Sequence, residues 1–275
     1  MSGLTLITLP IGNSGDITLR ALEALKNGAC FFAEDTRVFK ELLKSYGIDY
    51  SSKSIDSYHD QSVGKVEQII SKIKEGNDVY LVSDAGSPLI SDPAFPLVKR
   101  VLEEGIALNT LSGITALVTA LELSGLPPHP LHFWGFAPRT KGERVSSFKE
   151  IKNISGTHVF YESPHRIFES IDSFFSVFPD LVLVVARELT KTFQTVVHLD
   201  KSNFHDAKNL IVDKGEFVFL FHMAQVNHSV VFDELKEMID DYLDHGGGTK
   251  KLSKIFSKIC GEDAKSIYDK LSRSK

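Results

Sequence analysis

The sequence predicts an α/β protein with two α/β domains, a cleft between them, and a small helical region after them. Three observations predict this fold class. Short apolar runs alternate with amphipathic segments through the first half of the chain, which is typical of a mostly parallel sheet flanked by helices. A segment rich in proline, residues 125–130, then interrupts the alternation. Further apolar runs follow it, so we expect domains at residues 1–124 and 125–226 and a basic helical tail at 227–275.

The first half of the chain alternates predicted strands with predicted helices, with two helices in succession at residues 37–45 and 64–74. Residues 79–82 are consecutively apolar, which is typical of a strand that is buried on both faces of a parallel sheet. Residues 64–74 place Val66, Ile69 and Ile73 on one face of a helix. The predicted strands are residues 4–9, 29–33, 79–82 and 106–111. The predicted helices are residues 18–26, 37–45, 64–74, 95–104 and 114–123.

The second half predicts another α/β unit and then a helical tail. Glycines at 246–248 form a flexible joint within the tail. The strands of the second unit are expected at residues 157–161, 181–186 and 217–221, with a helix at 166–175. The tail helices are expected at residues 232–243, 249–259 and 264–271.

The composition limits the class of protein. The chain has 275 residues, of which 42% are hydrophobic, and this supports two domains of ordinary size. No apolar run is long enough to span a bilayer, and residues 1–10 lack the basic start of a secretion signal. The two cysteines, Cys30 and Cys260, suggest neither a disulfide framework nor a zinc site. We therefore expect a cytoplasmic protein that binds neither a membrane nor a metal ion.

The charge is unevenly distributed along the chain. The net charge is −5, which argues against indiscriminate binding to nucleic acid. Residues 249–275, in contrast, carry eight basic and three acidic side chains, and Lys250 and Lys251 stand near their start. A basic tail on an acidic body can attract RNA, and a solvated helical face that only aids solubility is the alternative.

Polar loops follow the predicted strands. The segment VSDAGSPLISDP, residues 82–93, contains Gly86 for close backbone approach, and Asp84 and Ser87 for polar contacts. Asp92 before Pro93 predicts the start of the next helix. Further loops of this kind occupy residues 10–13, 34–37, 111–116, 161–166 and 187–191. Because parallel sheets place ligands at the carboxyl ends of their strands, these loops predict a small-molecule site between the two units.

Each of these loops also has a purely structural interpretation. Residues 82–93 can be an ordinary turn between a strand and a helix, and residues 34–37 a helix N-terminus with acids matched to the dipole. Residues 165–166 can grip a phosphate or start a helix, and residues 187–188 can form an ion pair. The sequence lacks GxGxxG, GxxxxGK[ST], CxxC, HExxH and GxSxG, which are the common signatures of dehydrogenases, P-loop NTPases, zinc hydrolases and α/β-hydrolases.

Five segments in order carry a family resemblance. They are LPIGNSGDITLRALEAL, AEDTR, SDAGSPLISDP, FYESPHR and ARELTK. Together they resemble the ribosomal RNA small subunit methyltransferase I family, which has the tetrapyrrole methylase fold. The resemblance runs from about residue 4 to residue 221, and IYDKL near the end is similar to the C-terminal helices of that family. The family usually shows proline-glycine-proline-serine-alanine where residues 112–116 stand here without prolines, so we expect a looser loop.

The resemblance implies a reaction and a cofactor. The reaction is S-adenosylmethionine-dependent 2′-O-ribose methylation of a cytidine in the decoding region of 16S rRNA, within the small ribosomal subunit. The fold holds the cofactor in the cleft, and the protein is expected to be a homodimer. The residues that the resemblance assigns to S-adenosylmethionine are Pro10, Asp84, Ser87, Pro88, Thr115, Ala116 and Tyr161.

We expect residues of the polar clusters to carry out catalysis and RNA binding. A ribose hydroxyl is a poor nucleophile, so a general base or hydrogen-bond acceptor is expected. Its candidates are Glu34, Asp35, Asp84, Glu162 and His165. Guanidinium groups suit phosphate, and the expected RNA contacts are Arg37, Arg166, Arg187, Lys250 and Lys251. A methyltransferase of a tetrapyrrole or other small molecule, and a non-catalytic RNA-binding assembly factor, remain as alternatives.

Overall fold

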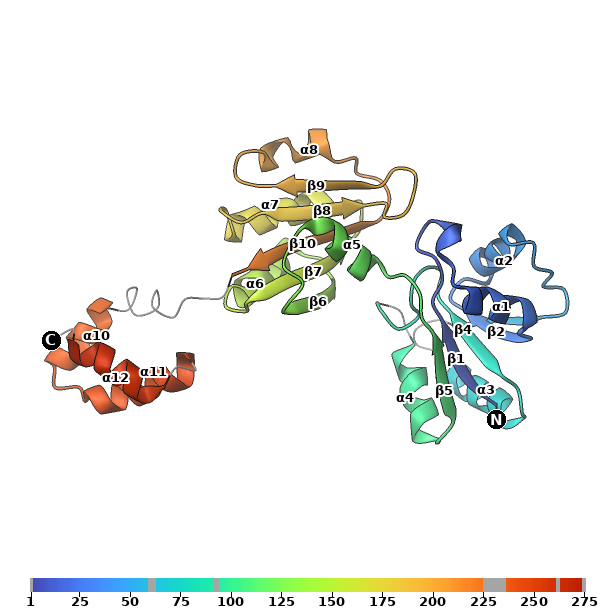
Figure 1. Ribbon diagram of the computed structural model, residues 1–275, viewed down its shortest axis with the longest axis horizontal. Coiled ribbons are helices and arrows are strands. Elements are labelled where there is room, and N and C mark those ends of the chain that lie inside the picture. The colour runs from blue at the N-terminus through green and yellow to red at the C-terminus, as the bar shows by residue number, and fades with distance from the viewer. Residues whose placement is uncertain (1, 59–62, 92–93, 225–235, 261–262, 274–275) are drawn as a thin grey trace. The chain divides into compact units, whose positions relative to one another are not determined.

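The computed structural model describes the whole chain except residues 1, 59–62, 92–93, 225–235, 261–262 and 274–275 (Figure 1). The described residues form two compact units. The larger unit covers residues 1–152 and 156–223, and the smaller covers residues 153–155 and 224–275. The larger unit holds two five-stranded sheets.

The first sheet is parallel throughout and has the order β3-β2-β4-β1-β5. Its strands are β1 (Gly3–Ile7), β2 (Cys30–Ala33), β3 (Ser54–Ser57), β4 (Val79–Val82) and β5 (Ala107–Leu111). The expectation of a parallel sheet is confirmed, and β4 has the predicted bounds. Since β1 and β4 lie inside the sheet, the loops that follow them start side by side at its carboxyl edge.

Helices cover both faces of the first sheet. They are α1 (Leu19–Asn27), α2 (Thr36–Ser45), α3 (Val63–Lys74) and α4 (Phe95–Glu103). Phe31 of β2 packs in the cluster that includes Leu25 of α1 and Phe39 of α2. Its neighbour Phe32 packs in the opposite cluster, with residues of α3 and α4 such as Leu97. Two covered faces explain why the interior strands β2 and β4 are continuously apolar instead of alternating.

The second sheet is mixed and has the order β6-β7-β10-β8-β9. Only the pairing of β6 with β7 is parallel among its ladders. Its strands are β6 (Leu131–Phe136), β7 (Gly156–Glu162), β8 (Leu183–Arg187), β9 (Thr195–Leu199) and β10 (Phe217–Met223). Its helices are α5 (Ala116–Ser124), α6 (Lys141–Ile151), α7 (Ile167–Val177) and α8 (Ala207–Leu210).

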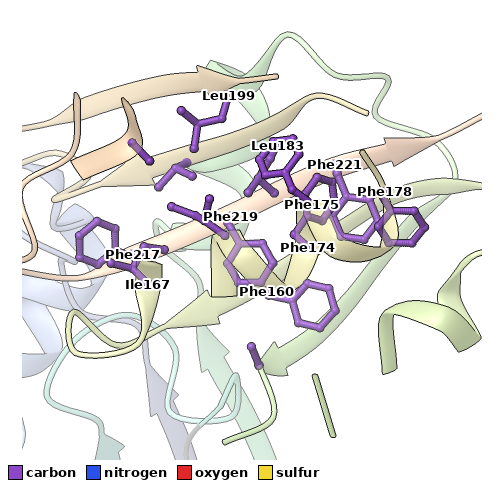
Figure 2. Packing of buried hydrophobic residues seen from close by; sticks show 14 of the residues in the cluster. Phe160, Ile167, Phe174, Phe175, Phe178, Leu183, Leu199, Phe217, Phe219 and Phe221 are labelled. Atoms are coloured by element: carbon purple, nitrogen blue, oxygen red, sulfur yellow. The ribbon is translucent and has the colours of Figure 1, made fainter. Parts of the chain in front are cut away.

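Aromatic residues fill one face of the second sheet. Figure 2 shows Phe160, Phe219 and Phe221 of the strands facing Phe174 of α7. Phe148 of α6 meets Phe160 and Phe174 edge to face, at ring-centroid distances of 5.7 and 6.0 Å. Such aromatic pairs add about 0.5–1.5 kcal/mol each beyond burial, so this face is a rigid support.

Helix α5 covers the other face of the second sheet. Its Ala120 is fully buried against Val184 of β8 and Leu220 of β10. The domain division expected at residue 124 assigns α5 to the first domain, yet its core contacts are with the second sheet. The N-terminus of α5 therefore connects the carboxyl edge of the first sheet to the second sheet within the same compact unit.

Several strands and one helix were not predicted from the sequence. Strand β3 reads SIDS and β9 reads TVVHL, which are short and half polar because both lie at sheet edges. Strand β6 follows the proline-rich segment directly. Helix α6 begins at Lys141, directly after its N-cap Thr140, which forms a capping box with Glu143. The helix start expected at Asp92 and Pro93 lies outside the described residues.

The smaller unit contains α10 (Lys236–Asp244), α11 (Thr249–Cys260) and α12 (Ala264–Arg273), which confirms a helical tail. Ile239, Phe256 and Ile267, one from each helix, share its core with Leu243 and Leu271. Lys250 and Lys251 lie exposed on α11. None of the described helices is long and apolar enough to span a membrane.

Candidate functional site

A cavity of about 270 Å³ lies where loops of the two sheets meet. From the first sheet it is lined by Glu34 after β2 and by the loop after β4, which includes Asp84. From the second sheet it is lined by Phe136, Glu162 and Glu216 at the adjoining ends of β6, β7 and β10. The cavity thus sits at the carboxyl ends of the parallel strands, where open α/β sheets bind ligands.

The loop after β4 presents its backbone to the cavity. Gly86 and Leu9 exchange backbone hydrogen bonds of 2.9 and 3.0 Å, which fastens this loop to the segment that follows β1. Gly86 has φ of +69°, a conformation that glycine adopts without the steric cost of a side chain. The Ser83 hydroxyl donates to the carbonyl of Ala85 at 3.1 Å and stabilises the turn. The loop is therefore preformed as one wall.

Two acidic side chains, Glu34 and Asp84, stand on this wall. The backbone N–H of Asp84 donates to Glu34 Oε2 at 3.4 Å, and Asp84 Oδ1 accepts from the N–H of Asp35 at 3.0 Å. Among the described residues, neither Glu34 nor Asp84 forms an ion pair. Both carboxylates line the cavity and keep lone pairs for a ligand.

Asp35, unlike Glu34 and Asp84, has a structural role at the start of α2. It caps the N-terminus of α2, and its Oδ2 lies 2.6 Å from an Arg37 guanidinium nitrogen. The hydrogen bonds from Arg37 hold the pKa of Asp35 well below its ordinary value. Arg37 itself is 86% exposed. Asp35 thus stays ionised outside the cavity lining, where a carboxylate already paired with arginine is a poor base.

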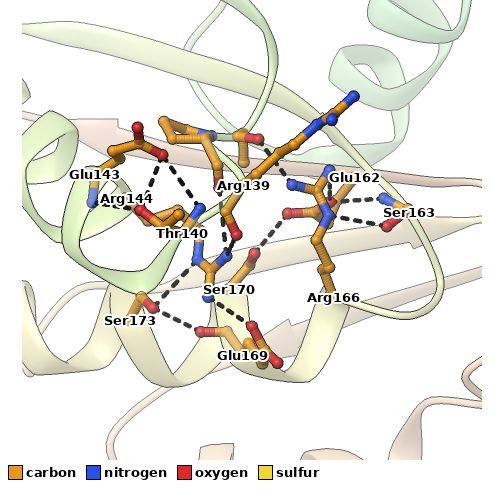
Figure 3. A network of polar contacts seen from close by, with 12 residues as sticks. Arg139, Thr140, Glu143, Arg144, Glu162, Ser163, Arg166, Glu169, Ser170 and Ser173 are labelled. Carbon is orange, nitrogen blue, oxygen red and sulfur yellow. Dashed lines mark hydrogen bonds and ion pairs between the residues drawn. The ribbon is translucent and has the colours of Figure 1, made fainter.

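The second sheet supplies a buried carboxylate, Glu162, that is fully engaged (Figure 3). Its Oε1 accepts from the N–H of Ser163 at 2.7 Å and lies 2.7 Å from a guanidinium nitrogen of Arg166. Its Oε2 accepts from the hydroxyl of Ser170 at 2.6 Å. Arg166 also donates to Ser163 Oγ at 3.1 Å and to the carbonyl of Ala137 at 3.3 Å. The Glu162 carboxylate and the Arg166 guanidinium are therefore paired with each other and hydrogen bonded to neighbouring groups of the protein.

The loop after β8 is held in an uncommon conformation. Glu188 and Thr190 have φ of +51° and +66°, which side-chain-bearing residues rarely adopt. Lys191 Nζ lies 2.8 Å from Glu188 Oε1 and 2.9 Å from Glu216 Oε2. Burial acts to lower the pKa of Lys191, but these two hydrogen bonds outweigh it and raise the pKa. The same lysine thereby fixes Glu216 at the cavity.

The predicted phosphate contact Arg187 is also engaged. Its Nε donates to the carbonyl of Lys214 at 2.6 Å, and its NH1 donates to the carbonyl of Phe193 at 3.2 Å. From the adjoining loop, Thr190 Oγ1 accepts from the N–H of Asn13 at 3.0 Å. The ARELTK segment therefore contacts and stabilises the loop that follows β1 through Thr190.

The loop without prolines, residues 112–116, still reaches the cavity. Thr115 caps α5 by accepting from the N–H of Val118 at 3.4 Å, and Thr115 and Ala116 line the cavity. A Cβ at Gly113 would lie 3.2 Å from Thr8, tighter than ordinary contact. Close packing and a helix cap thus order this loop in place of prolines.

The structure brings part of the predicted set together. The cavity lining contains Glu34, Asp84, Ser87, Thr115, Ala116, Tyr161 and Glu162. Four other residues predicted for catalysis or cofactor binding, all in the described part of the chain, lie outside that lining: Pro10, Asp35, Pro88 and His165. Pro10 and Pro88 are buried beside it, and Pro88 lines a separate small cavity with Glu34, whereas His165 is exposed on the turn before α7.

Some residues that line the cavity were not predicted from the sequence. Phe136 ends β6, a strand that was not predicted, and Glu216 precedes β10 by one residue. Ile11 and Ile90 contribute apolar surface to the cavity. They lie in loops for which the sequence predicted only polar or small residues as ligand contacts. The apolar run LHFWGF was the available signal for Phe136, since a strand there ends at the same edge of the sheet as β7.

The donor set of the cavity fits a cationic nucleoside ligand. The rings of Phe136 and Tyr161 meet edge to face at 5.7 Å and offer an aromatic wall. Glu34 and Asp84 offer negative charge and hydrogen-bond acceptors, and Ser87 and Thr115 add hydroxyls. S-Adenosylmethionine has a flat base, a ribose diol and a sulfonium charge, so these residues suit it. Within the described residues, no cluster of three or more His, Cys, Asp or Glu side chains could hold a metal ion.

Comparison with known proteins defines the class. The sequence matches the family described as Tetrapyrrole (Corrin/Porphyrin) Methylases over residues 3–203. The structure resembles cobalt precorrin-4 methyltransferase with a TM-score of 0.59 and 16% identity, over 80% of this chain and 94% of that one. It also resembles uroporphyrin-III C-methyltransferase of Thermus thermophilus, solved with S-adenosyl homocysteine, with a TM-score of 0.53 and 14% identity. That second match covers 80% of this chain and 97% of the other. At these identities the likeness shows the fold: that of a tetrapyrrole methylase.

Sequence relatives define the family more narrowly. Ribosomal RNA small subunit methyltransferase I of Neisseria meningitidis serogroup A is 34% identical over 97% of this chain and 91% of its own. The protein of the same name from Bacillus subtilis strain 168 is 33% identical over 98% and 94%. The chain therefore belongs to the ribosomal RNA small subunit methyltransferase I family, and the resemblance found in its sequence is confirmed.

Proposed function

We propose that this protein transfers a methyl group from S-adenosylmethionine to the ribose 2′-hydroxyl of a cytidine in the decoding region of 16S rRNA. We further propose that it does so in the cytoplasm, as a homodimer, on the small ribosomal subunit. Relatives that cover nearly the whole chain and are named ribosomal RNA small subunit methyltransferase I support the reaction and the RNA. The observation that carries the proposal is the acidic and aromatic cavity at the carboxyl ends of the parallel strands.

The residues that would hold the cofactor come from both sheets. The backbone of the loop after β4, with Asp84 and Ser87, would bind its polar groups, and Phe136 and Tyr161 would contact its base. When bound, the cofactor supplies an electrophilic methyl group on a sulfonium. Carboxylates at Glu34 and Asp84 favour a positively charged ligand in a partly enclosed cavity.

Glu34 is the best-placed acceptor for the proton of the 2′-hydroxyl. It lines the cavity and, among the described residues, has no cation paired with it. Asp35 is paired with Arg37, and Glu162 is buried and fully hydrogen bonded. His165 is exposed and outside the lining. Of the predicted bases, Glu34 and Asp84 both combine access to the cavity with free acceptor capacity. Because Asp84 is assigned here to the cofactor, we propose Glu34 as the base, and a positioned base contributes about 100-fold or more to rate.

RNA contacts are proposed for exposed basic side chains. Arg37 is 86% exposed at the start of α2, near Asp84. Lys250 and Lys251 are exposed on α11 in a tail of net positive charge. Arg166 and Arg187 hold the fold around the cavity through Glu162 and backbone carbonyls, so we propose a supporting role for both.

The direct test uses labelled S-adenosylmethionine and small subunits from cells that lack the modification. We expect label in 16S rRNA, at one cytidine whose 3′ phosphodiester becomes resistant to alkaline cleavage. Binding of the cofactor without label in rRNA would contradict the proposal. Label appearing in a tetrapyrrole would then favour a small-molecule methyltransferase, and RNA binding without any transfer would favour an assembly factor.

A further inference from the structure

A short loop joins the cavity to helix α6. Residues 136–139, called here the 136–139 loop, begin at Phe136, which lines the cavity and is 56% exposed. The N–H of Ala137 donates to the carbonyl of Tyr161 at 3.0 Å, so the loop continues the β6–β7 pairing. At its other end, Thr140 caps α6 in the capping box with Glu143. Both ends of the loop are therefore fixed.

Two arginines hold the 136–139 loop from the inside (Figure 3). Arg144 is fully buried, and its NH1 donates to the carbonyls of Pro138 at 3.3 Å and Arg139 at 2.8 Å. Arg166 NH1 donates to the carbonyl of Ala137 at 3.3 Å. Three consecutive carbonyls thus turn inward toward guanidinium groups.

The remaining donors of Arg144 are also used. Its Nε donates to Ser173 Oγ at 3.4 Å, and its NH2 donates to Glu169 Oε2 at 2.9 Å. Burying a guanidinium is costly unless its N–H groups are paired, and these four hydrogen bonds tie Arg144 to the loop and to α7. The loop is consequently rigid before any substrate arrives.

The Arg139 side chain points the other way. Its carbonyl is bound inward, whereas the residue is exposed, and Figure 3 shows its side chain extending away from the dashed contacts. Among the residues that the structure describes, none accepts a hydrogen bond or an ion pair from its guanidinium. The arginines at 37, 166 and 187 differ, because each is engaged with a carboxylate or with carbonyls.

We propose that Arg139 binds a phosphate of the substrate RNA next to the nucleotide that enters the cavity. The proposal rests on the proposed function, since it needs RNA as the substrate. A guanidinium presents a planar fork that matches phosphate oxygens, and a preordered backbone lowers the entropic cost of using it. Phe136, three residues earlier, lines the cavity, so Arg139 stands on a chain segment that leads directly away from it.

The test compares Arg139→Ala with the matched control Lys149→Ala, an exposed cation on α6. We measure binding of a 16S rRNA fragment by filter retention from about 50 to about 200 mM salt, and methyl transfer at varied RNA concentration. For Arg139→Ala we expect RNA Kd and KM to rise about tenfold and the salt slope to fall by about one. We expect kcat, cofactor Kd and Tm to stay within error, and Arg139→Lys to recover part of the binding.

The outcomes separate this proposal from the proposed function. Unchanged RNA Kd and salt slope in Arg139→Ala, or an equal loss in Lys149→Ala, would overturn the phosphate contact. A raised cofactor Kd or a lowered Tm in Arg139→Ala would also overturn it, because a structural role would then explain the loss. If the wild-type protein binds this RNA but transfers no methyl group, the proposed function fails, and the binding data still decide the role of Arg139.

Discussion

The two walls of the cavity use carboxylates in opposite ways. On the wall from the first sheet, Glu34 and Asp84 accept hydrogen bonds only from backbone N–H groups among the described residues. On the wall from the second sheet, Glu162 is bound to Arg166 and Ser170, and Glu216 is bound to Lys191. The carboxylates of the first wall therefore keep free acceptor capacity, whereas those of the second wall are held in ion pairs.

The contrast has a physical origin in the two sheets. The parallel sheet ends in turns whose N–H groups solvate a carboxylate without neutralising it. On the mixed sheet, the Glu162 side chain is fully buried, where a charge without a counter-ion would be expensive, whereas Glu216 is largely exposed and pairs with Lys191. Substitutions on the two walls should consequently have different consequences, and they can be ranked by size.

The largest effect is expected for Glu162→Ala. Removing one member of a buried ion pair leaves the other charge uncompensated, which costs about 3–5 kcal/mol in the free energy of unfolding. Chemical denaturation of Glu162→Ala measures this loss directly. The exposed Glu150 of α6 is the matched control, and Glu150→Ala should stay within about 0.5 kcal/mol of wild type. Equal stability of the two variants would show that the pair at Glu162 does not hold the second wall.

The next effect is expected for Glu34→Gln. Loss of a proton acceptor should lower kcat by about 100-fold or more, which is about 2.7 kcal/mol, while the fold remains intact. Single-turnover transfer to rRNA at saturating cofactor measures the rate. Asp35→Asn serves as the neighbouring control and should retain the rate, since Asp35 lies outside the cavity lining. A Glu34→Gln rate equal to wild type would remove Glu34 from the chemistry.

A smaller effect is expected for Gly86→Ala. A side chain at φ of +69° costs about 1 kcal/mol, although the space around its Cβ is open apart from Ile11 at 3.5 Å. Thermal unfolding should show a lower Tm. Gly142→Ala is the control, because Gly142 lies in α6 with a negative φ and an added Cβ meets nothing within 4 Å. That substitution should be neutral or stabilising, and destabilisation by both would point to a general loss of packing instead.

The smallest effect concerns pH and Asp35. Its pKa is lowered in the folded state, so its contribution to stability is present above the ordinary value of 3.8 and is lost as the pH falls through the folded pKa. Asparagine caps a helix as well as aspartate, so Asp35→Asn removes only the charge. We expect the stability difference between wild type and Asp35→Asn to narrow as the pH drops below 3.8. A difference that is constant across this range would contradict the assigned pairing with Arg37.

The sequence predicted the first wall better than the second. The apolar run at β4 and the small polar residues after it place Asp84 at the carboxyl end of a parallel strand, and the polar loops after other strands favour a ligand site there over an ordinary turn. Phe136 could not be placed in the same way, because its strand follows the proline-rich segment and pairs with β7, more than twenty residues later. The commitment of Glu162 depends on Ser170, and that of Arg166 on Ala137, which only tertiary structure brings near.

One measurement tests most directly whether the first wall serves the reaction and the second wall serves stability. It determines kcat and Tm together for Glu34→Gln and Glu162→Gln. We expect Glu34→Gln to keep its Tm and lose methyl transfer to rRNA. We expect Glu162→Gln to lose Tm and keep kcat in its folded fraction at lower temperature. The opposite pattern, with Glu162→Gln inactive at full stability and Glu34→Gln active, would contradict the account.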